Sequence, residues 1–175
     1  DLVRSRGLGD VYKRQGKKDA VVAIVKKITE KKGAPCKKTL QKMVYLIEAK
    51  GVDLGCDYGI HFYGPYSADL DYTVRSLDDE GILSISYSEM GHNISVADDS
   101  ICEKYENNLV NQIIEEFGED TPSELELLTT TLYVYKQQKN DGKTVDGVIK
   151  IKGSKYTNSH IWQALKRLRE QKYIS

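Results

Sequence analysis

The chain has 175 residues, in which 26 Lys and Arg balance 26 Asp and Glu, and 39% of the residues are hydrophobic. That length is enough for one domain of ordinary size or two small ones with a buried core. No run approaches the roughly 18 consecutive apolar residues of a membrane-spanning helix, and no secretory signal pattern is present. Three cysteines form an odd, widely spaced set that favours reduced thiols and a cytoplasmic location.

The zero net charge hides an asymmetric distribution along the chain. Residues 1–50 carry 14 Lys and Arg against 5 Asp and Glu, residues 51–130 carry 2 against 18, and residues 131–175 carry 10 against 3. Basic ends around an acidic middle indicate either that the chain pairs its own segments or that it offers different faces to different partners.

The segment 1–15 shows neither helical nor strand periodicity. The stretch from Arg6 to Gln15 resembles translated adapter sequence at the ends of metagenomic reading frames, and the first residue is Asp rather than Met. We therefore expect 1–15 to be a non-native leader that contributes nothing to folding.

Apolar residues at three- and four-residue spacing predict three amphipathic helices after this segment. The first covers about 19–32 and ends at Gly33, the second covers 37–50, and the third covers 67–80 with Ser67 as its N-cap. Their apolar faces contain, in chain order, Ala20, Val21, Ile24, Val25 and Ile28; Leu40, Met43, Val44, Leu46 and Ile47; and Leu70, Val74 and Leu77.

Two segments alternate with the period of a β-strand. In residues 58–63, Tyr58, Ile60 and Phe62 alternate with smaller or polar residues, and Gly64-Pro65 is expected to form the turn that follows. Residues 83–97 alternate on both sides of a glycine-containing loop, so they are predicted to form a β-hairpin. A hairpin placed after helices indicates a winged-helix-like unit.

Four further helices are predicted in the second half of the chain. The spacing of Ser100 and Glu103 is typical of a capping box, and Thr121-Pro122-Ser123-Glu124 forms a second one with proline at the first helical position. A shorter helix and a last helix capped by Thr157 follow. The apolar positions of these helices include Tyr105, Ile113, Leu125, Leu128, Leu132, Val145, Val148, Ile161, Trp162, Leu165 and Leu168.

The predicted fold is mostly α with a small β-hairpin, which places it in the α+β class. After the leader, we expect a winged-helix-like unit over 16–97, a connecting helix over 98–120 and a helix-turn-helix-like unit over 121–175.

Several motifs are distinctive when they are taken together. They are Leu40-Gln41-Lys42-Met43-Val44-Tyr45-Leu46, Phe62-Tyr63-Gly64-Pro65-Tyr66-Ser67, Leu77 to Ile82, Leu125 to Leu128, and Trp162 to Leu168. With these motifs the chain resembles the uncharacterised YwgA-like proteins and, more distantly, the Panacea domain of SocA-like antitoxins. The resemblance implies a helical, winged-helix-like fold without catalytic residues. Panacea members serve as antitoxins that bind toxins, or as adaptors that deliver a partner to a protease.

The residues that usually carry catalysis show no matching pattern. His61, His92 and His160 lie in three different predicted elements, and the cysteines are spaced 20 and 46 residues apart, which matches no zinc motif. The carboxylates within 69–80 are expected to form a solvated helix face. We therefore expect no catalytic residue, no metal and no cofactor, and a hydrolase or nuclease is the least supported class.

The candidate protein interface is the turn Tyr63-Gly64-Pro65-Tyr66. It forms either a rigid corner whose tyrosines pack on the core or an aromatic contact for a partner, because aromatic side chains dominate interface hot spots.

The candidate nucleic-acid interface is the last helix with the segment before it. Phosphates attract Lys and Arg, and amide side chains can contact base edges. The same basic residues can instead pair with the acidic middle of the chain, and the sequence leaves both possibilities open. The candidate residues are Lys150, Lys152, Lys155, Asn158, Gln163, Lys166, Arg167, Arg169 and Lys172.

These features predict a non-enzymatic, cytoplasmic protein that binds a macromolecule. The expected function is protein–protein recognition of the antitoxin or adaptor kind, with a toxin or a protease substrate as partner. The alternative is a winged-helix transcriptional regulator that binds duplex DNA through residues 150–172. No membrane contact is expected.

Overall fold

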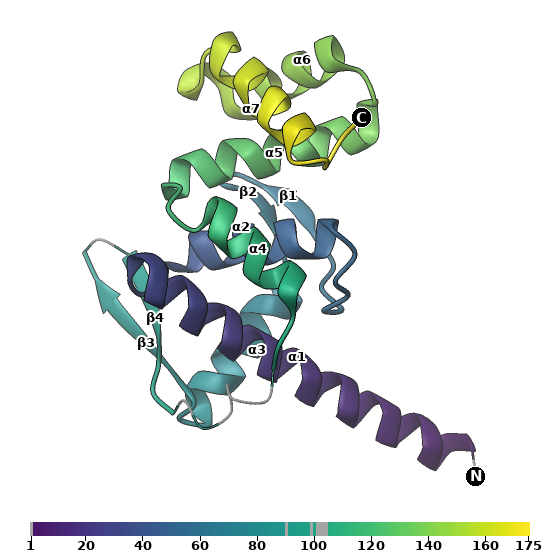
Figure 1. Cartoon of the computed structure of the whole chain (residues 1–175), viewed down its shortest axis with the longest axis vertical. Helices are drawn as coiled ribbons and strands as arrows, with labels where there is room; N and C mark the ends of the chain where they lie inside the picture. Colours follow the sequence, from purple (N-terminus) through teal and green to yellow (C-terminus); the bar gives the residue numbers. More distant parts are fainter. Residues whose placement is uncertain (1, 90, 99, 101–104) are drawn as a thin grey trace. The chain divides into compact units, whose positions relative to one another are not determined.

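The computed structural model of the chain describes the backbone of residues 2–89, 91–98, 100 and 105–175, with side chains from Arg14 onward. Within these residues the chain forms seven α-helices and two two-stranded antiparallel sheets (Figure 1). This arrangement confirms the mostly α fold with a small hairpin and adds a second hairpin. The residues group into two compact units, each built from segments that are not contiguous in sequence.

The first unit covers 1–37, 53–56 and 68–119. Its elements are α1 (Leu2–Lys32), α3 (Ala68–Asp79), β3 (Leu83–Ser88), β4 (Gly91–Val96) and α4 (Asn108–Phe117). Helix α1 packs against α3, α4 and β4, and α3 packs against β3. The strands pair with Leu83 opposite Val96, as expected for the predicted hairpin. The buried core consists mainly of Ala20, Val21, Ile24, Val25, Ile28, Leu70, Val74, Leu77, Leu83, Ile94, Ile113 and Phe117.

Two helices of this unit begin at residues that differ from those predicted from the sequence. Helix α1 begins at Leu2 rather than near residue 19, so most of the segment 1–15 continues the helix. Helix α4 begins at Asn108, where the Asn107 side chain accepts hydrogen bonds from two backbone N–H groups. Tyr105 therefore precedes the helix, and Glu103 of the expected capping box lies outside the described residues.

The second unit covers 38–52, 57–67 and 120–175. It contains nearly all of α2 (Lys37–Ala49), then β1 (Gly59–His61), β2 (Gly64–Tyr66), α5 (Pro122–Gln138), α6 (Asp141–Lys152), the 3₁₀ turn η2 (Gly153–Lys155) and α7 (Asn158–Glu170). This grouping differs from the sequential division at 97 and 121, because α2 and the first hairpin associate with the C-terminal helices.

Helix α5 is the central element of the second unit. It packs against α6, α7 and β2, and all residues from Leu125 to Leu132 are buried. Its start confirms the predicted capping box: the Thr121 hydroxyl accepts from Glu124 N at 3.1 Å, and the Glu124 carboxylate accepts from Thr121 N at 3.0 Å. Buried polar side chains are usually satisfied by partners inside the protein. Accordingly, the hydroxyls of Thr129 and Thr131 donate to carbonyls one turn earlier.

The first hairpin corrects the predicted turn. Ile60 pairs with Pro65, and His61 pairs with Gly64, so the turn is formed by Phe62 and Tyr63. The prediction of a turn at Gly64-Pro65 was wrong, because these two residues form strand β2. The expected apolar side of the strand was also wrong, since Ile60 and Phe62 are exposed. In α7, the predicted buried face holds for Leu165 and Leu168, whereas Trp162 is exposed.

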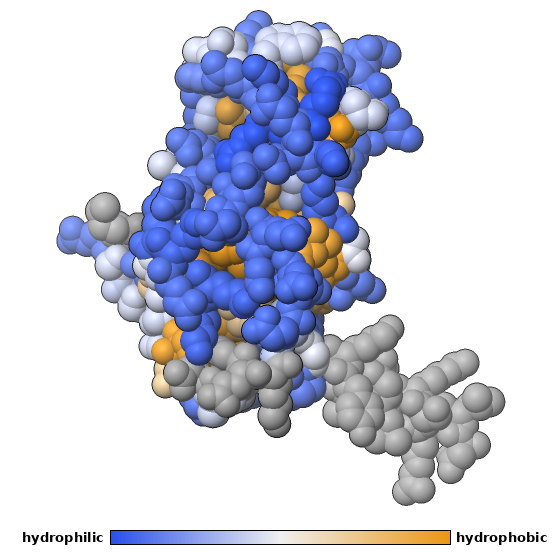
Figure 2. Space-filling view, in the orientation of Figure 1, coloured by the Kyte–Doolittle hydropathy of each residue, from blue (hydrophilic) through white to orange (hydrophobic). Residues whose placement is uncertain are grey.

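The face drawn in Figure 2 is largely hydrophilic where its residues are described. On this face, apolar side chains appear as small patches between polar ones. Among the described residues, no helix combines the length and the apolar character needed to cross a bilayer.

Candidate functional site

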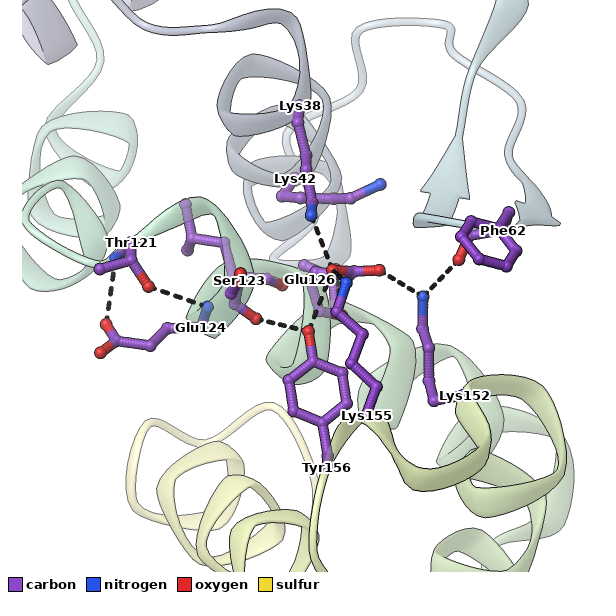
Figure 3. Close-up of polar contacts among 12 residues, drawn as sticks. Lys38, Lys42, Phe62, Thr121, Ser123, Glu124, Glu126, Lys152, Lys155 and Tyr156 are labelled. Atoms are coloured by element: carbon purple, nitrogen blue, oxygen red, sulfur yellow. Dashed lines mark hydrogen bonds and ion pairs between the residues drawn. The ribbon is translucent and has the colours of Figure 1, made fainter. Parts of the chain in front are cut away.

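A buried carboxylate lies at the centre of the second unit. Glu126 is fully buried, and its oxygens accept hydrogen bonds from Lys152 at 2.5 Å, Lys155 at 2.6 Å and Lys38 at 2.7 Å. The Tyr156 hydroxyl also donates to this carboxylate, at 3.0 Å (Figure 3). We call these five residues the Glu126 cluster.

Four parts of the chain bring the cluster together. Glu126 lies in the second turn of α5, Lys38 in the first turn of α2, and Lys152 at the end of α6. Lys155 follows in η2. Gly153 has a φ of 59°, a left-handed value that glycine adopts at low cost. The chain therefore turns sharply after α6, and both Lys152 and Lys155 reach the same carboxylate.

The surroundings of Glu126 hold it in the ionised form. Burial alone raises the pKa of its carboxyl, but the hydrogen bonds from Lys152, Lys155, Lys38 and Tyr156 outweigh burial and lower the pKa to about 2. Burial, together with the bond to this carboxylate, also raises the pKa of the Tyr156 phenol. The cluster is therefore a fixed arrangement of charges at neutral pH.

A further lysine lies beside the cluster. Lys42 of α2 is buried, and its ammonium group donates to the Pro65 carbonyl at 2.6 Å. Burial lowers the pKa of Lys42 to about 7, with Lys152 and Lys38 adding repulsion and Glu126 opposing the shift. The neighbouring Thr130 hydroxyl is buried and has no hydrogen-bond partner in the described part of the chain. It faces Gly64, where an added Cβ would lie 2.8 Å from the hydroxyl oxygen.

The tip of the first hairpin lies on the Glu126 cluster. Lys152 donates a second hydrogen bond, at 2.7 Å, to the Phe62 carbonyl (Figure 3). The ammonium groups of Lys38 and Lys155 lie over the Tyr63 ring, 5.2 and 5.8 Å from its centroid. Phe62 and Tyr63 are 76% and 58% exposed. Two aromatic rings therefore protrude from a backbone that the cluster holds in place.

The candidate protein interface is thus divided by the structure. Of its four residues, Tyr63 is exposed, Gly64 and Pro65 are buried, and Tyr66 is half-buried with its ring 4.8 Å from that of His61. Strand β2 therefore packs inward and the turn before it projects outward, and whether the exposed Tyr63 contacts a partner stays a prediction. Sequence reasoning missed Phe62 as a surface residue because it assigned this residue to the core side of a strand.

The candidate nucleic-acid interface is divided in a similar way. Lys152 and Lys155 belong to the Glu126 cluster, Arg167 pairs with Asp120, and Arg169 pairs with Asp141 at 3.0 Å. Three of these four basic residues pair with the acidic middle of the chain, which was one of the two possibilities left open. The other candidates are exposed, namely Lys150, Asn158, Gln163, Lys166 and Lys172, with Lys166 4.0 Å from Glu170.

Sequence reasoning did not identify Glu126, Lys38 or Lys42 as site residues. One signal was present: Glu126 is the only charged residue between Leu125 and Tyr135. A carboxylate within such an apolar and threonine-rich run is typical of a buried, paired charge. Its lysine partners come from distant segments and leave no local signal. Among the described residues, no group of three or more His, Cys, Asp or Glu side chains is placed to bind a metal ion.

Fold and site together define a mostly α-helical protein with two hairpins, in which a lysine–carboxylate cluster supports an aromatic hairpin tip. No protein-family model matches the chain. The chain is similar to the uncharacterized protein YwgA of Bacillus subtilis (strain 168), with 27% identity over 146 residues that cover 79% of this chain and 87% of YwgA. The predicted resemblance to YwgA is confirmed, whereas the more distant likeness to the Panacea domain stays a prediction.

Proposed function

We propose that this chain is a non-enzymatic protein-interaction module of the antitoxin or adaptor kind. Its contact surface is the hairpin tip, Phe62 and Tyr63, with the adjoining lysines Lys38 and Lys155. The observation that carries the proposal is the exposure of two adjacent aromatic rings on a backbone fixed by Lys152. Rigid, exposed aromatic side chains are the commonest hot spots of protein interfaces, because they bury a large area at little entropic cost.

The site also suits binding better than catalysis. The Glu126 carboxylate is buried, and its oxygens accept hydrogen bonds from Lys38, Lys152, Lys155 and Tyr156. A carboxylate engaged in this way has a low pKa, which makes it a weak general base. Its role in the proposal is structural: it gathers the lysines beneath the aromatic tip.

A quantitative affinity capture from lysate of the source organism tests this proposal. The wild-type chain is compared with Phe62→Ala and with Tyr72→Ala. Tyr72 is an equally exposed aromatic residue, at 75%, that lies on α3 in the other unit. We expect a protein partner that is retained by the wild type and by Tyr72→Ala and is lost by Phe62→Ala.

Melting temperatures of the three proteins serve as the control for folding. Because Phe62 is exposed, its replacement should leave the melting temperature unchanged. A partner set that is the same for Phe62→Ala and the wild type contradicts the proposal.

The duplex-DNA alternative has less support. Phosphate contacts draw on Lys and Arg side chains, and three of the candidates, Lys152, Arg167 and Arg169, have carboxylate partners within the chain. Titration of the chain with duplex DNA at low salt tests this alternative directly.

A further inference from the structure

The Glu126 cluster and its surroundings carry more positive than negative charge. Three ammonium groups, those of Lys38, Lys152 and Lys155, pair with the one carboxylate of Glu126 in the described residues. Buried charges are normally matched by charges of opposite sign. The excess therefore has to be met by solvent or by an anionic partner.

Two of these lysines can be reached from outside. The side chains of Lys155 and Lys38 are 40% and 24% exposed, whereas that of Lys152 is buried beneath them. Lys155 and Lys38 both contact the same oxygen of Glu126, so their ammonium groups lie close together. One carboxylate arriving from solvent can therefore contact both groups from the side opposite Glu126.

The same two lysines connect this anion site to the aromatic tip. Both ammonium groups lie over the ring of Tyr63, and the Phe62 ring lies edge-on to Tyr63 at 4.9 Å between centroids. A ligand that contacts the lysines is therefore next to an apolar surface. The matching ligand combines a negative charge with an adjacent apolar side chain.

The arrangement of the rings favours a peptide over a nucleic acid. Bases bind aromatic side chains by stacking on open, parallel faces. Here the rings of Phe62 and Tyr63 are perpendicular, with an interplanar angle of 90°, and lysine ammonium groups already lie over the Tyr63 ring. The reachable lysines also form one compact pair rather than a row along a backbone.

We infer that the hairpin tip binds a short acidic segment of a partner protein, in which a carboxylate bridges Lys38 and Lys155 and a neighbouring apolar side chain packs on Phe62. This inference rests on the proposed function and specifies the chemistry of the partner.

Fluorescence anisotropy tests the inference. The probe is a short fluorescein-labelled peptide with glutamates on both sides of a central leucine, and a peptide with glutamine in place of glutamate is the comparison. We expect the acidic peptide to bind and the glutamine peptide not to bind. Lys155→Gln and Lys38→Gln should each weaken binding by up to about fivefold, the upper end of what one partly exposed ion pair contributes.

Lys150→Gln is the matched control. Lys150 is an exposed lysine on α6, so its replacement removes the same charge from the same unit. We expect its affinity for the acidic peptide to equal that of the wild type. An equal loss in Lys150→Gln would show that binding follows net charge alone and would overturn the inference.

Two other results would overturn it as well. One is no binding of the acidic peptide at low salt. The other is tighter binding of oligo(dT) of the same length, with the same dependence on Lys38 and Lys155. Either result leaves the proposed function intact if Phe62→Ala still loses its partner in the affinity capture. Retention of that partner by Phe62→Ala contradicts the proposed function itself.

Discussion

At the scale of single residues, the buried Glu126 carboxylate has a large energetic role because three lysines pair with it. Removing one partner of a buried ion pair costs about 3–5 kcal/mol, because the remaining charges lose their compensation. We therefore expect Glu126→Gln to lower the free energy of unfolding by about 3 kcal/mol at pH 7. Chemical denaturation measures this change. Glu124→Gln, at the exposed capping box, is the control and should cost less than about 1 kcal/mol.

Glu126 also makes a prediction for acidic pH. Its pKa is about 2 in the folded chain, while its ordinary value is 4.5. Between these values the unfolded chain binds a proton that the folded chain does not, so stability falls as the pH is lowered from 4.5 towards 2. The pH dependence of the unfolding free energy should be shallower over this range in Glu126→Gln. An identical slope in wild type and variant would count against the ionised, paired carboxylate.

Lys42 leads to a prediction for the stability of the chain at alkaline pH. Its pKa is about 7 in the folded chain against an ordinary 10.5, so between these values the unfolded chain again binds more protons. Stability should therefore rise with pH above 7, and Lys42→Met should flatten that rise. Melting temperatures measured up to about pH 9.5, below the ionisation of tyrosine, provide the test. Lys150→Met is expected to keep the wild-type slope.

Gly64 can be compared with a glycine that has nearly the same φ angle. Gly64 has a φ of 96°, and Gly51 has a φ of 97°. Alanine at either position should cost about 1–2 kcal/mol for the left-handed backbone. At Gly64 the new methyl group would also meet the Thr130 hydroxyl, whereas at Gly51 nothing lies within 4 Å. Thermal unfolding should therefore show a larger loss for Gly64→Ala than for Gly51→Ala.

At the scale of elements, helices with local signals could be predicted from the sequence. Local signals of this kind act within one helical turn, so residue types alone specify them. They are the capping box of Thr121 and Glu124, the N-cap at Thr157 and the glycine after α1. The first hairpin could not be predicted in this way. Gly64-Pro65 has the composition of a turn, but the buried position of β2 against α5 decides its role, and that contact is distant in sequence.

The start of helix α1 could also not be predicted from local sequence signals. Its periodic, buried residues begin at Ala20, and the preceding side chains from Arg14 onward are exposed or half-buried. We expect deletion of residues 1–15 to leave the melting temperature unchanged, because the apolar residues of this segment lack the regular spacing of a helix face that packs on a core. Thermal unfolding measures this directly. A drop of many degrees would mean that the segment packs on the first unit.

At the scale of the whole molecule, ion pairs inside each unit join basic and acidic segments that are separated along the sequence. In the first unit, Lys18 pairs with Glu80, Lys31 with Glu115 and Lys37 with Asp71. In the second unit, Lys38, Lys152 and Lys155 pair with Glu126, and Arg167 pairs with Asp120. Both basic ends of the chain therefore pair with its acidic middle. The charge pattern predicted this possibility, but only the three-dimensional structure identifies the partners.

The core of the second unit depends on its last helix. Leu165 of α7 is fully buried, as the helical spacing predicted. Leu165→Ala should therefore lower the free energy of unfolding by about 2–5 kcal/mol. Chemical denaturation is the measurement, and Gln163→Ala, on the exposed side of the same helix, is the control. A loss below about 0.5 kcal/mol would contradict the position of α7 in the core.

The chain passes from one unit to the other five times, between residues 37 and 38, 52 and 53, 56 and 57, 67 and 68, and 119 and 120. This has a consequence for synthesis on the ribosome. Lys38 emerges 88 residues before Glu126, a delay on the order of ten seconds at ordinary elongation rates. During that interval α2 and the first hairpin are present without the helix that gathers their lysines. A nascent chain that stalls before α5 therefore exposes an unmatched basic, aromatic segment, which is the kind of surface that chaperones and proteases engage.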